Sequence, residues 1–223
     1  MPRCLLITGA SRGLGRALTE AYAAEGWRVH AIARHAHDLG TVPNVWVHEM
    51  ELTDRKSIAT LRTRFAEERL ELVINNAGTW GPKAQDLGPI DAEAWIDAFR
   101  VNAMVPYYVA EALADPLARG RGTVVTITSR MGSIGDNGSG GDYVYRSSKA
   151  AANMVVRSLA RDLAPRGIGA VALHPGWVRT EMGGPEAPLS IQESVDMMRR
   201  TIAGLTLKDS GKFLNLDGNA LPW

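Results

Sequence analysis

Tyr145 and Lys149 are the residues whose types and spacing are best suited to chemistry in this sequence. They stand four positions apart at the start of an Ala-rich apolar run, and if that run is helical, both side chains project from one face. A free phenol titrates near pH ~10, too high for proton transfer at neutral pH. A cation within a few ångströms lowers the phenol pKa, so the pair predicts a general acid or base.

A glycine-rich turn near the N-terminus is the second chemical feature. An apolar run over residues 3–8, typical of a strand buried on both faces, breaks into a turn with Gly9, Gly13 and Gly15 and then a helical pattern to about Glu25. Glycines let the backbone approach a ligand, and amides at a helix N-terminus donate to anions. This order of strand, turn and helix predicts a site for a nucleotide pyrophosphate.

The next strand is predicted over residues 27–33, and the residue that follows it indicates which dinucleotide the chain binds. Dinucleotide folds place an acidic residue there to bind the adenosine ribose, whereas this chain has Arg34, with Arg12 in the glycine turn as a second base. Two guanidiniums suit a 2′-phosphate, so we expect NADP(H) to be preferred over NAD(H). The alternative is that both arginines are solvated surface residues.

Strand and helix patterns alternate along the whole chain. Further strands are predicted over residues 45–50, 70–74, 123–129, 169–173 and 212–216, with helices from residue 55, over 91–113, from Tyr145 to about 164 and up to about 205. Without a repeat or linker, this indicates one α/β domain over residues 1–223, a doubly wound, seven-stranded parallel sheet with helices on both faces. Ligands bind such sheets at the carboxyl ends of the strands, where the glycine turn and Ser129 fall.

The composition of the chain excludes several classes of partner. The chain has 223 residues with 25 basic and 24 acidic ones, which gives no reason to expect a nucleic acid or an anionic membrane as partner. Cys4, the single cysteine, excludes an intrachain disulfide, and its place in the first strand predicts a buried, inert thiol. No apolar run is long enough to span a bilayer. We expect a cytoplasmic protein, and no pattern indicates a metal site.

Six motifs occur in the order of the short-chain dehydrogenase/reductase family, and the chain resembles that family from Thr8 to its last strand. They are Thr8-Gly-x-x-x-Gly13-x-Gly15, Asn75-Asn-Ala-Gly78, Asn102, Ser129, Tyr145-x-x-x-Lys149 and Pro175-Gly176. Residues 140–149 and 174–184 look most like the Sniffer-type carbonyl reductases and the C-factor-like proteins. The resemblance implies a Rossmann-type fold and NAD(P)-dependent oxidoreduction.

The resemblance also implies residue roles. Tyr145 is the general acid or base, Lys149 lowers its pKa and holds the nicotinamide ribose, Ser129 orients the carbonyl, and Asn102 supports a relay water. Ser133 and Tyr143 compete for two of these roles, but Ser129 occupies the family's strand-end position and only Tyr145 lies one helical turn from Lys149. Besides Tyr145 and Lys149, the expected cofactor contacts are Gly9, Ser11, Arg12, Gly13, Leu14, Gly15, Arg34, Glu51, Leu52, Asn76, Ala77, Gly78, Pro175, Gly176, Trp177, Val178 and Thr180. Glu51 stands where the family usually has Asp.

The expected reaction is reduction of an aldehyde, ketone or quinone to an alcohol. We expect an apolar, adaptable pocket, and because the substrate segment around residues 181–205 is short, with glycines that make it mobile or kinked, selection should be loose. The expected pocket walls are Trp80, Arg130, Met131, Trp177 and Met182. One alternative is an NADP(H)-binding sensor or signalling protein of the C-factor type. Another is an interaction protein, whose apolar tail through Leu221 and Trp223 contacts a second copy in a homodimer or homotetramer.

Pro106 falls inside the predicted helix over residues 91–113. Proline has no backbone N–H, so the carbonyl four residues earlier, that of Asn102, loses its intrahelical partner. We therefore expect a kink at Asn102 whose main-chain oxygen holds an ordered water near Lys149. The simpler alternative is that Pro106 ends one helix and begins another.

Overall fold

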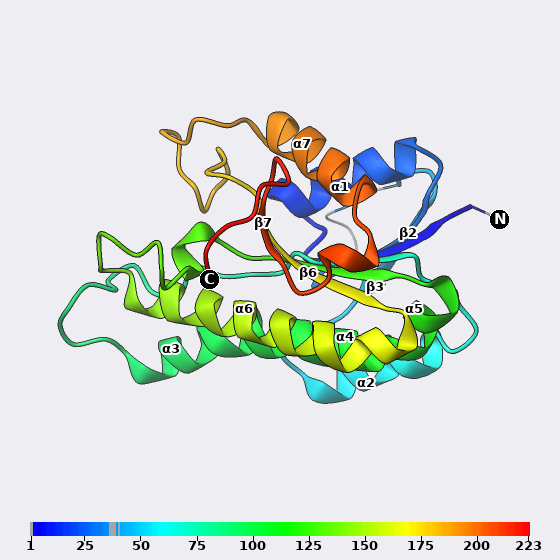
Figure 1. Ribbon diagram of the computed structural model, residues 1–223, viewed down its shortest axis with the longest axis horizontal. Coiled ribbons are helices and arrows are strands. Elements are labelled where there is room, and N and C mark those ends of the chain that lie inside the picture. Colours follow the sequence, from blue (N-terminus) through cyan, green and yellow to red (C-terminus); the bar gives the residue numbers. More distant parts are fainter. Residues whose placement is uncertain (1, 36–38, 40) are drawn as a thin grey trace.

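A parallel sheet forms the centre of the computed structural model, which describes residues 2–35, 39 and 41–223 (Figure 1). Within these residues, seven strands pair in the order β3-β2-β1-β4-β5-β6-β7. The strands are β1 (Cys4–Thr8), β2 (Arg28–Ala33), β3 (Val45–Glu49), β4 (Leu72–Asn75), β5 (Thr123–Ile127), β6 (Gly169–His174) and β7 (Phe213–Asn215). The predicted seven-stranded parallel sheet is confirmed.

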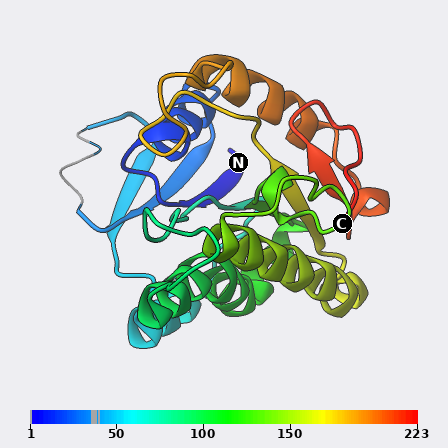
Figure 2. The same cartoon turned by 90° about the vertical axis from the view of Figure 1, so that its left-hand side faces the viewer.

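Helices cover both faces of the sheet (Figures 1 and 2). On one face lie α1 (Gly13–Ala24) and α7 (Ile191–Ala203), and on the other lie α2 (Arg55–Arg64), α3 (Ala92–Phe99), α4 (Val105–Ala112), α5 (Ala114–Gly120) and α6 (Tyr143–Leu163). Short helical turns are η3 (Arg130–Gly132), η4 (Ala164–Arg166) and η5 (Leu207–Asp209). None of the helices in the described part of the chain combines the length and hydrophobicity that crossing a bilayer requires.

Successive side chains along each strand point to opposite faces of the sheet, so the hydrophobic core has two layers. In β1, Leu5 and Ile7 pack with the cluster under α1 and α7, whereas Cys4 and Leu6 pack with the cluster under the other helices. All five residues of β1 are buried, as the apolar run predicted. Complete burial of one Leu or Ile contributes about 1.5–3 kcal/mol, so both faces hold the sheet in place.

The strand order reverses at β1, which pairs with β2 on one side and with β4 on the other. Because every pairing is parallel, the carboxyl ends of β1, β4, β5 and β6 lie at one edge of the sheet. The loops after Thr8, Asn75, Ile127 and His174 therefore meet there.

The region around Pro106 differs from the single predicted helix. α3 ends at Phe99, a π-helical turn η2 (Arg100–Met104) follows, and α4 begins at Val105 with Pro106 in its first turn. The N–H of Val105 bonds to the carbonyl of Arg100, five residues back. The missing N–H of proline favours such a widened turn. Pro106 therefore stands where one helix has ended and another begins, as the simpler alternative predicted, and Asn102 lies in the π-helical turn between them.

Candidate active site

Tyr145 and Lys149 lie on the first turns of α6, which begins two residues earlier than predicted, at Tyr143. Both side chains are buried, with 7% and 5% exposed. The Lys149 Nζ lies 5.7 Å from the centre of the Tyr145 ring and donates to the carbonyl of Ile127, at the end of β5, over 3.2 Å. The helical spacing thus brings a phenol and an ammonium together at the carboxyl edge.

Ser129 is placed by the short turn η3, not by β5, which ends at Ile127. Its Oγ accepts the N–H of Met131 over 3.1 Å, and the Ser129 side chain lies near enough to the Tyr145 phenol to lower its pKa. The competing Ser133 instead donates to the carbonyl of Trp223. The structure therefore pairs Ser129, and not Ser133, with Tyr145.

Burial controls the protonation of the pair. It raises the pKa of Tyr145 to about 12, while the Ser129 side chain acts in the opposite direction. Burial also lowers the pKa of Lys149 to about 8. Burial of the phenolate is the larger cause, so the Tyr145 pKa is raised; a lowering contribution from Lys149 stays a prediction.

Asn102 ties the π-helical turn to the loop after β4. Its Nδ2 donates to the carbonyl of Thr79 over 2.8 Å and to Ser148 Oγ over 2.9 Å, and its Oδ1 accepts the Thr79 N–H over 2.9 Å. A Cβ on Gly78 would lie 3.3 Å from Asn102 Oδ1 and 3.4 Å from Lys149 Nζ. Gly78 therefore lies where Asn102 and Lys149 meet.

The glycine turn fits a dinucleotide. Gly9 adopts a φ of +66°, and a Cβ there would lie 2.8 Å from the Cα of Ala77, while a Cβ on Gly15 would lie 2.1 Å from the Gly9 carbonyl oxygen. Asn76 Nδ2 holds the turn against the loop after β4 by donating to the carbonyls of Thr8 and Gly9, each over 3.1 Å. Among the described residues, no side chain caps α1. Its first amides therefore suit an anion such as a pyrophosphate.

Three of the residues expected at the adenosine end, Arg12, Arg34 and Glu51, are exposed. Arg34 lies just beyond β2, and Arg12 forms an ion pair with Glu181 from the segment after β6. Glu51 Oε1 accepts hydrogen bonds from the N–H and Oγ1 of Thr53 at 3.0 and 2.8 Å. The neighbouring Leu52 is buried. Both guanidiniums can reach solvent, but that of Arg12 already has a carboxylate partner.

The segment after β6 folds back on itself. Gly176 adopts a φ of +81°, and Val178 forms a bridge with Leu189. The Trp177 indole donates to the carbonyl of Gly183 over 2.8 Å. Gly184, one of the glycines expected to make the segment mobile or kinked, adopts a φ of +76°, and hydrogen bonds from Trp177 and Arg179 join the two sides of the loop.

This segment also approaches the glycine turn. A Cβ on Gly13 would lie 3.8 Å from Thr180 Cγ2. At its other end, the Pro175 carbonyl accepts a hydrogen bond from Ser194 on α7 over 2.6 Å. The loop therefore spans from α7 to the turn at the start of α1.

Among the expected pocket residues, Trp80 is the one seen in contact with Tyr145. The two rings stack with centroids 4.3 Å apart and planes inclined by 27°. Arg130 and Met131 lie in η3 beside Ser129, with Arg130 ion-paired to Asp136. Trp177 and Met182, on the loop after β6, are 56% and 48% exposed.

Gln85 is an active-site residue that the sequence analysis missed. Only 2% of it is exposed, and its side chain bonds to the loop that carries Trp80 and to the N–H of Tyr145. No local signal marks it, since it is one polar residue in an irregular stretch. Its neighbours on α6 are distant in sequence, so only the fold brings them together.

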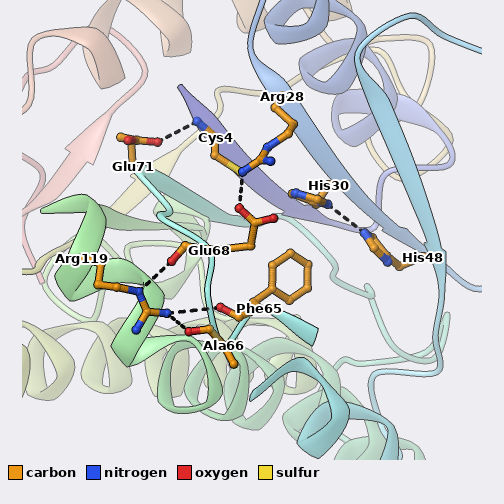
Figure 3. Close-up of polar contacts among 9 residues, drawn as sticks. All are labelled: Cys4, Arg28, His30, His48, Phe65, Ala66, Glu68, Glu71 and Arg119. Carbon is orange, nitrogen blue, oxygen red and sulfur yellow. Dashed lines mark hydrogen bonds and ion pairs between the residues drawn. The ribbon is translucent and has the colours of Figure 1, made fainter. Parts of the chain in front are cut away.

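A second polar cluster lies at the amino-terminal ends of β1 and β2 (Figure 3). The potential metal ligands of Cys4, His30 and Glu68 lie within 4.8 Å of one another. Arg28, however, ion-pairs with Glu68 next to Cys4, so a guanidinium supplies the positive charge. Cys4 is 1% exposed, and burial raises the pKa of its thiol, as expected for an inert cysteine. We interpret this cluster as structural.

Comparisons with known proteins agree with this geometry. The short chain dehydrogenase family model matches residues 3–188. C-signal of Myxococcus xanthus is 45% identical over 155 residues, covering 69% of this chain and 93% of that protein. The carbonyl reductase Sniffer of D. melanogaster has a TM-score of 0.92 at 31% identity, covering 100% of both chains. An NADPH-bound carbonyl reductase from chicken fatty liver has a TM-score of 0.90 at 30% identity, covering 100% of this chain and 99% of that one.

Proposed function

The chain belongs to the short-chain dehydrogenase family, and on that premise we propose that it is an NADPH-dependent reductase of aldehydes, ketones or quinones. The single observation that carries the proposal is the buried Tyr145 phenol, next to Ser129 and close to Lys149, beside a glycine turn that fits a dinucleotide. Similarity to the Sniffer and chicken carbonyl reductases supports the same reaction class.

In this proposal Tyr145 supplies the proton. Because its pKa is about 12, the phenol is protonated at neutral pH and can donate from Oη to the oxygen of a carbonyl compound. Ser129 Oγ, next to the same phenol, orients that oxygen. The Lys149 ammonium stabilises the phenolate that proton donation leaves behind. A bound nicotinamide supplies the hydride.

The remaining expected contacts are assigned to cofactor binding in the same proposal. The amides at the start of α1 hold the pyrophosphate, and the loop over residues 175–180 covers the nicotinamide end. Arg12 and Arg34 bind the 2′-phosphate of NADPH, which requires Arg12 to exchange Glu181 for the phosphate. Glu51 and Leu52 lie beside the adenine.

Turnover of NADPH tests the proposal. The decrease of NADPH absorbance is recorded with a panel of aldehydes, aromatic ketones and quinones, using wild type and Tyr145→Phe. We expect turnover with apolar carbonyl compounds in the wild type and its loss in the variant. Equal rates in both proteins would contradict the role of Tyr145, and absence of turnover across the panel would contradict the enzyme assignment.

A signalling or sensor role is the second candidate, favoured by the 45% identity to C-signal. In that case the protein binds NADP(H) with little turnover. Calorimetric titration with NADPH, combined with the same panel, separates the two functions, because a sensor binds the nucleotide but leaves its absorbance unchanged. Cytoplasmic location and assembly into a homodimer or homotetramer stay predictions.

A further inference from the structure

Gln85 provides the hydrogen bonds that begin helix α6. The first amides of a helix lack intrahelical partners and usually bond to a capping side chain just before them. Asp142 occupies that position, with a φ of 48°, but among the described residues it makes no side-chain capping bond. Instead, the Tyr143 N–H bonds to the backbone carbonyl of Gln85 over 3.0 Å, and the Tyr145 N–H bonds to Gln85 Oε1 over 2.7 Å. The cap comes from a residue 60 positions away.

The other end of the same amide holds the loop that carries Trp80. Gln85 Nε2 donates to the carbonyls of Trp80 and Pro82, over 2.9 and 2.8 Å. Gly81 between them adopts a φ of +90°, and a Cβ there would lie 3.0 Å from Val144 Cγ1. The buried Gln85 side chain thus donates hydrogen bonds to the Trp80 loop through Nε2 and accepts one from α6 through Oε1.

Both rings of the stacked pair therefore depend on Gln85. Its acceptor fixes the backbone of Tyr145, and its donor fixes the backbone of Trp80, whose indole lies on that phenol. Breaking these bonds would also leave buried polar groups unpaired, which is costly enough to keep the arrangement unique.

We propose that Gln85 is a positioning residue for the reaction, which sets the Tyr145 phenol and the Trp80 indole in one fixed arrangement. The inference rests on the proposed function, in which Tyr145 donates the proton. Gln85 acts through the two aromatic residues and does not itself touch the reacting atoms. Losing its hydrogen bonds leaves the glycine turn intact, so cofactor binding stays while the proton donor is misplaced.

The matched variants are Gln85→Met, which keeps a side chain of similar length but none of these bonds, and Glu67→Met. Glu67 is exposed between α2 and β4, outside the proposed site, so its variant controls for the substitution itself. We expect Gln85→Met to lower kcat by about 10- to 100-fold, as small misplacements of catalytic groups do. NADPH affinity should stay within about twofold of wild type, and Glu67→Met should match wild type in both.

Two readouts do not depend on turnover. Hydrogen exchange resolved to single amides should show slow exchange at Tyr145 in wild type and fast exchange in Gln85→Met. Spectrophotometric titration, with Tyr145→Phe subtracted, should show the pKa of Tyr145 falling from about 12 in Gln85→Met as water reaches the phenol. Gln85→Glu keeps an acceptor for the Tyr145 N–H and should restore its slow exchange.

Fast exchange of the Tyr145 amide in the wild type would overturn the inference. So would wild-type kcat, or an unchanged Tyr145 titration, in folded Gln85→Met. If Gln85→Met does not fold, Gln85→Glu tests the inference instead. Its kcat should fall, because its side chain has no donor for the carbonyls of Trp80 and Pro82. Full activity of Gln85→Glu would refute the positioning role. Failure of the proposed function appears separately, as absent turnover in wild type with the exchange and titration results intact.

Discussion

The Trp80 indole stacks on the Tyr145 phenol, with ring centroids 4.3 Å apart. Such a pair contributes about 0.5–1.5 kcal/mol beyond its buried area. The indole covers one face of the phenol, and burial of the phenol as a whole is the main cause of the raised Tyr145 pKa. Trp80 therefore affects the proton donor as well as the shape of the pocket.

Trp80→Ala should lower the pKa of Tyr145 from about 12, because water replaces the indole. The same variant should raise KM for aromatic ketones more than for small aldehydes, since a planar substrate loses a stacking partner. Phenol titration and kinetics with both substrate types measure these effects. Trp177→Ala, at a site 56% exposed, is the control; if it shifts the titration equally, the stacking explanation fails.

Tyr145→Phe should reduce kcat by at least the ~10²–10⁴-fold typical of general acid catalysis while cofactor affinity changes little. Lys149→Ala should impair both, because its Nζ lies near Gly78 in the expected cofactor site as well as near the phenol. Steady-state kinetics and nucleotide titration separate the effects. Retention of activity in Tyr145→Phe would remove Tyr145 from the mechanism.

Arg34→Ala should weaken NADPH binding by roughly one to two decades and leave NADH binding nearly unchanged, since a charge-assisted bond to a phosphate is worth about 1.5–3 kcal/mol. Glu181→Gln frees Arg12 from its ion pair and should leave NADPH affinity equal or higher. Calorimetric titration of both nucleotides checks these outcomes. Equal affinity of the wild type for NADH and NADPH would refute the predicted preference.

Acid should destabilise the protein through His30 and His174, because burial lowers the pKa of each to about 4. The unfolded chain binds these protons near pH ~6.5, so the stabilisation is complete above that value and is lost as pH falls towards 4. The expected loss is roughly 2 kcal/mol per histidine at about pH 5. Urea unfolding of wild type, His30→Leu and His174→Leu at about pH 5 and 7 measures it. Variants with the pH dependence of wild type would contradict the prediction.

The π-helical turn before Pro106 should hold an ordered water at the main-chain oxygen of Asn102, close to Lys149. A high-resolution crystal structure with bound cofactor shows whether this water is present. Pro106→Ala should restore a regular α-helical turn, and it should lower kcat more than it weakens cofactor affinity. A dry site, or the Asn102 carbonyl bonded to a backbone N–H in wild type, would exclude the relay.

Local sequence patterns determined the fold class and the location of the candidate site. An apolar run followed by glycines specifies a strand and a turn over a few residues, and parallel strands place their carboxyl ends at one edge. The spacing of Tyr145 and Lys149 needed only one helical turn. These features rest on short-range geometry, which is why they could be predicted.

Tertiary contacts decided what the local patterns could not. The cap from Gln85 to Tyr145 joins residues 60 positions apart, and the ion pair from Arg12 to Glu181 joins residues 169 apart. The direction of the Tyr145 pKa was also a tertiary result, because the surrounding fold buries the phenol. Burial and long-range pairing are sums over neighbours that only the folded chain brings together.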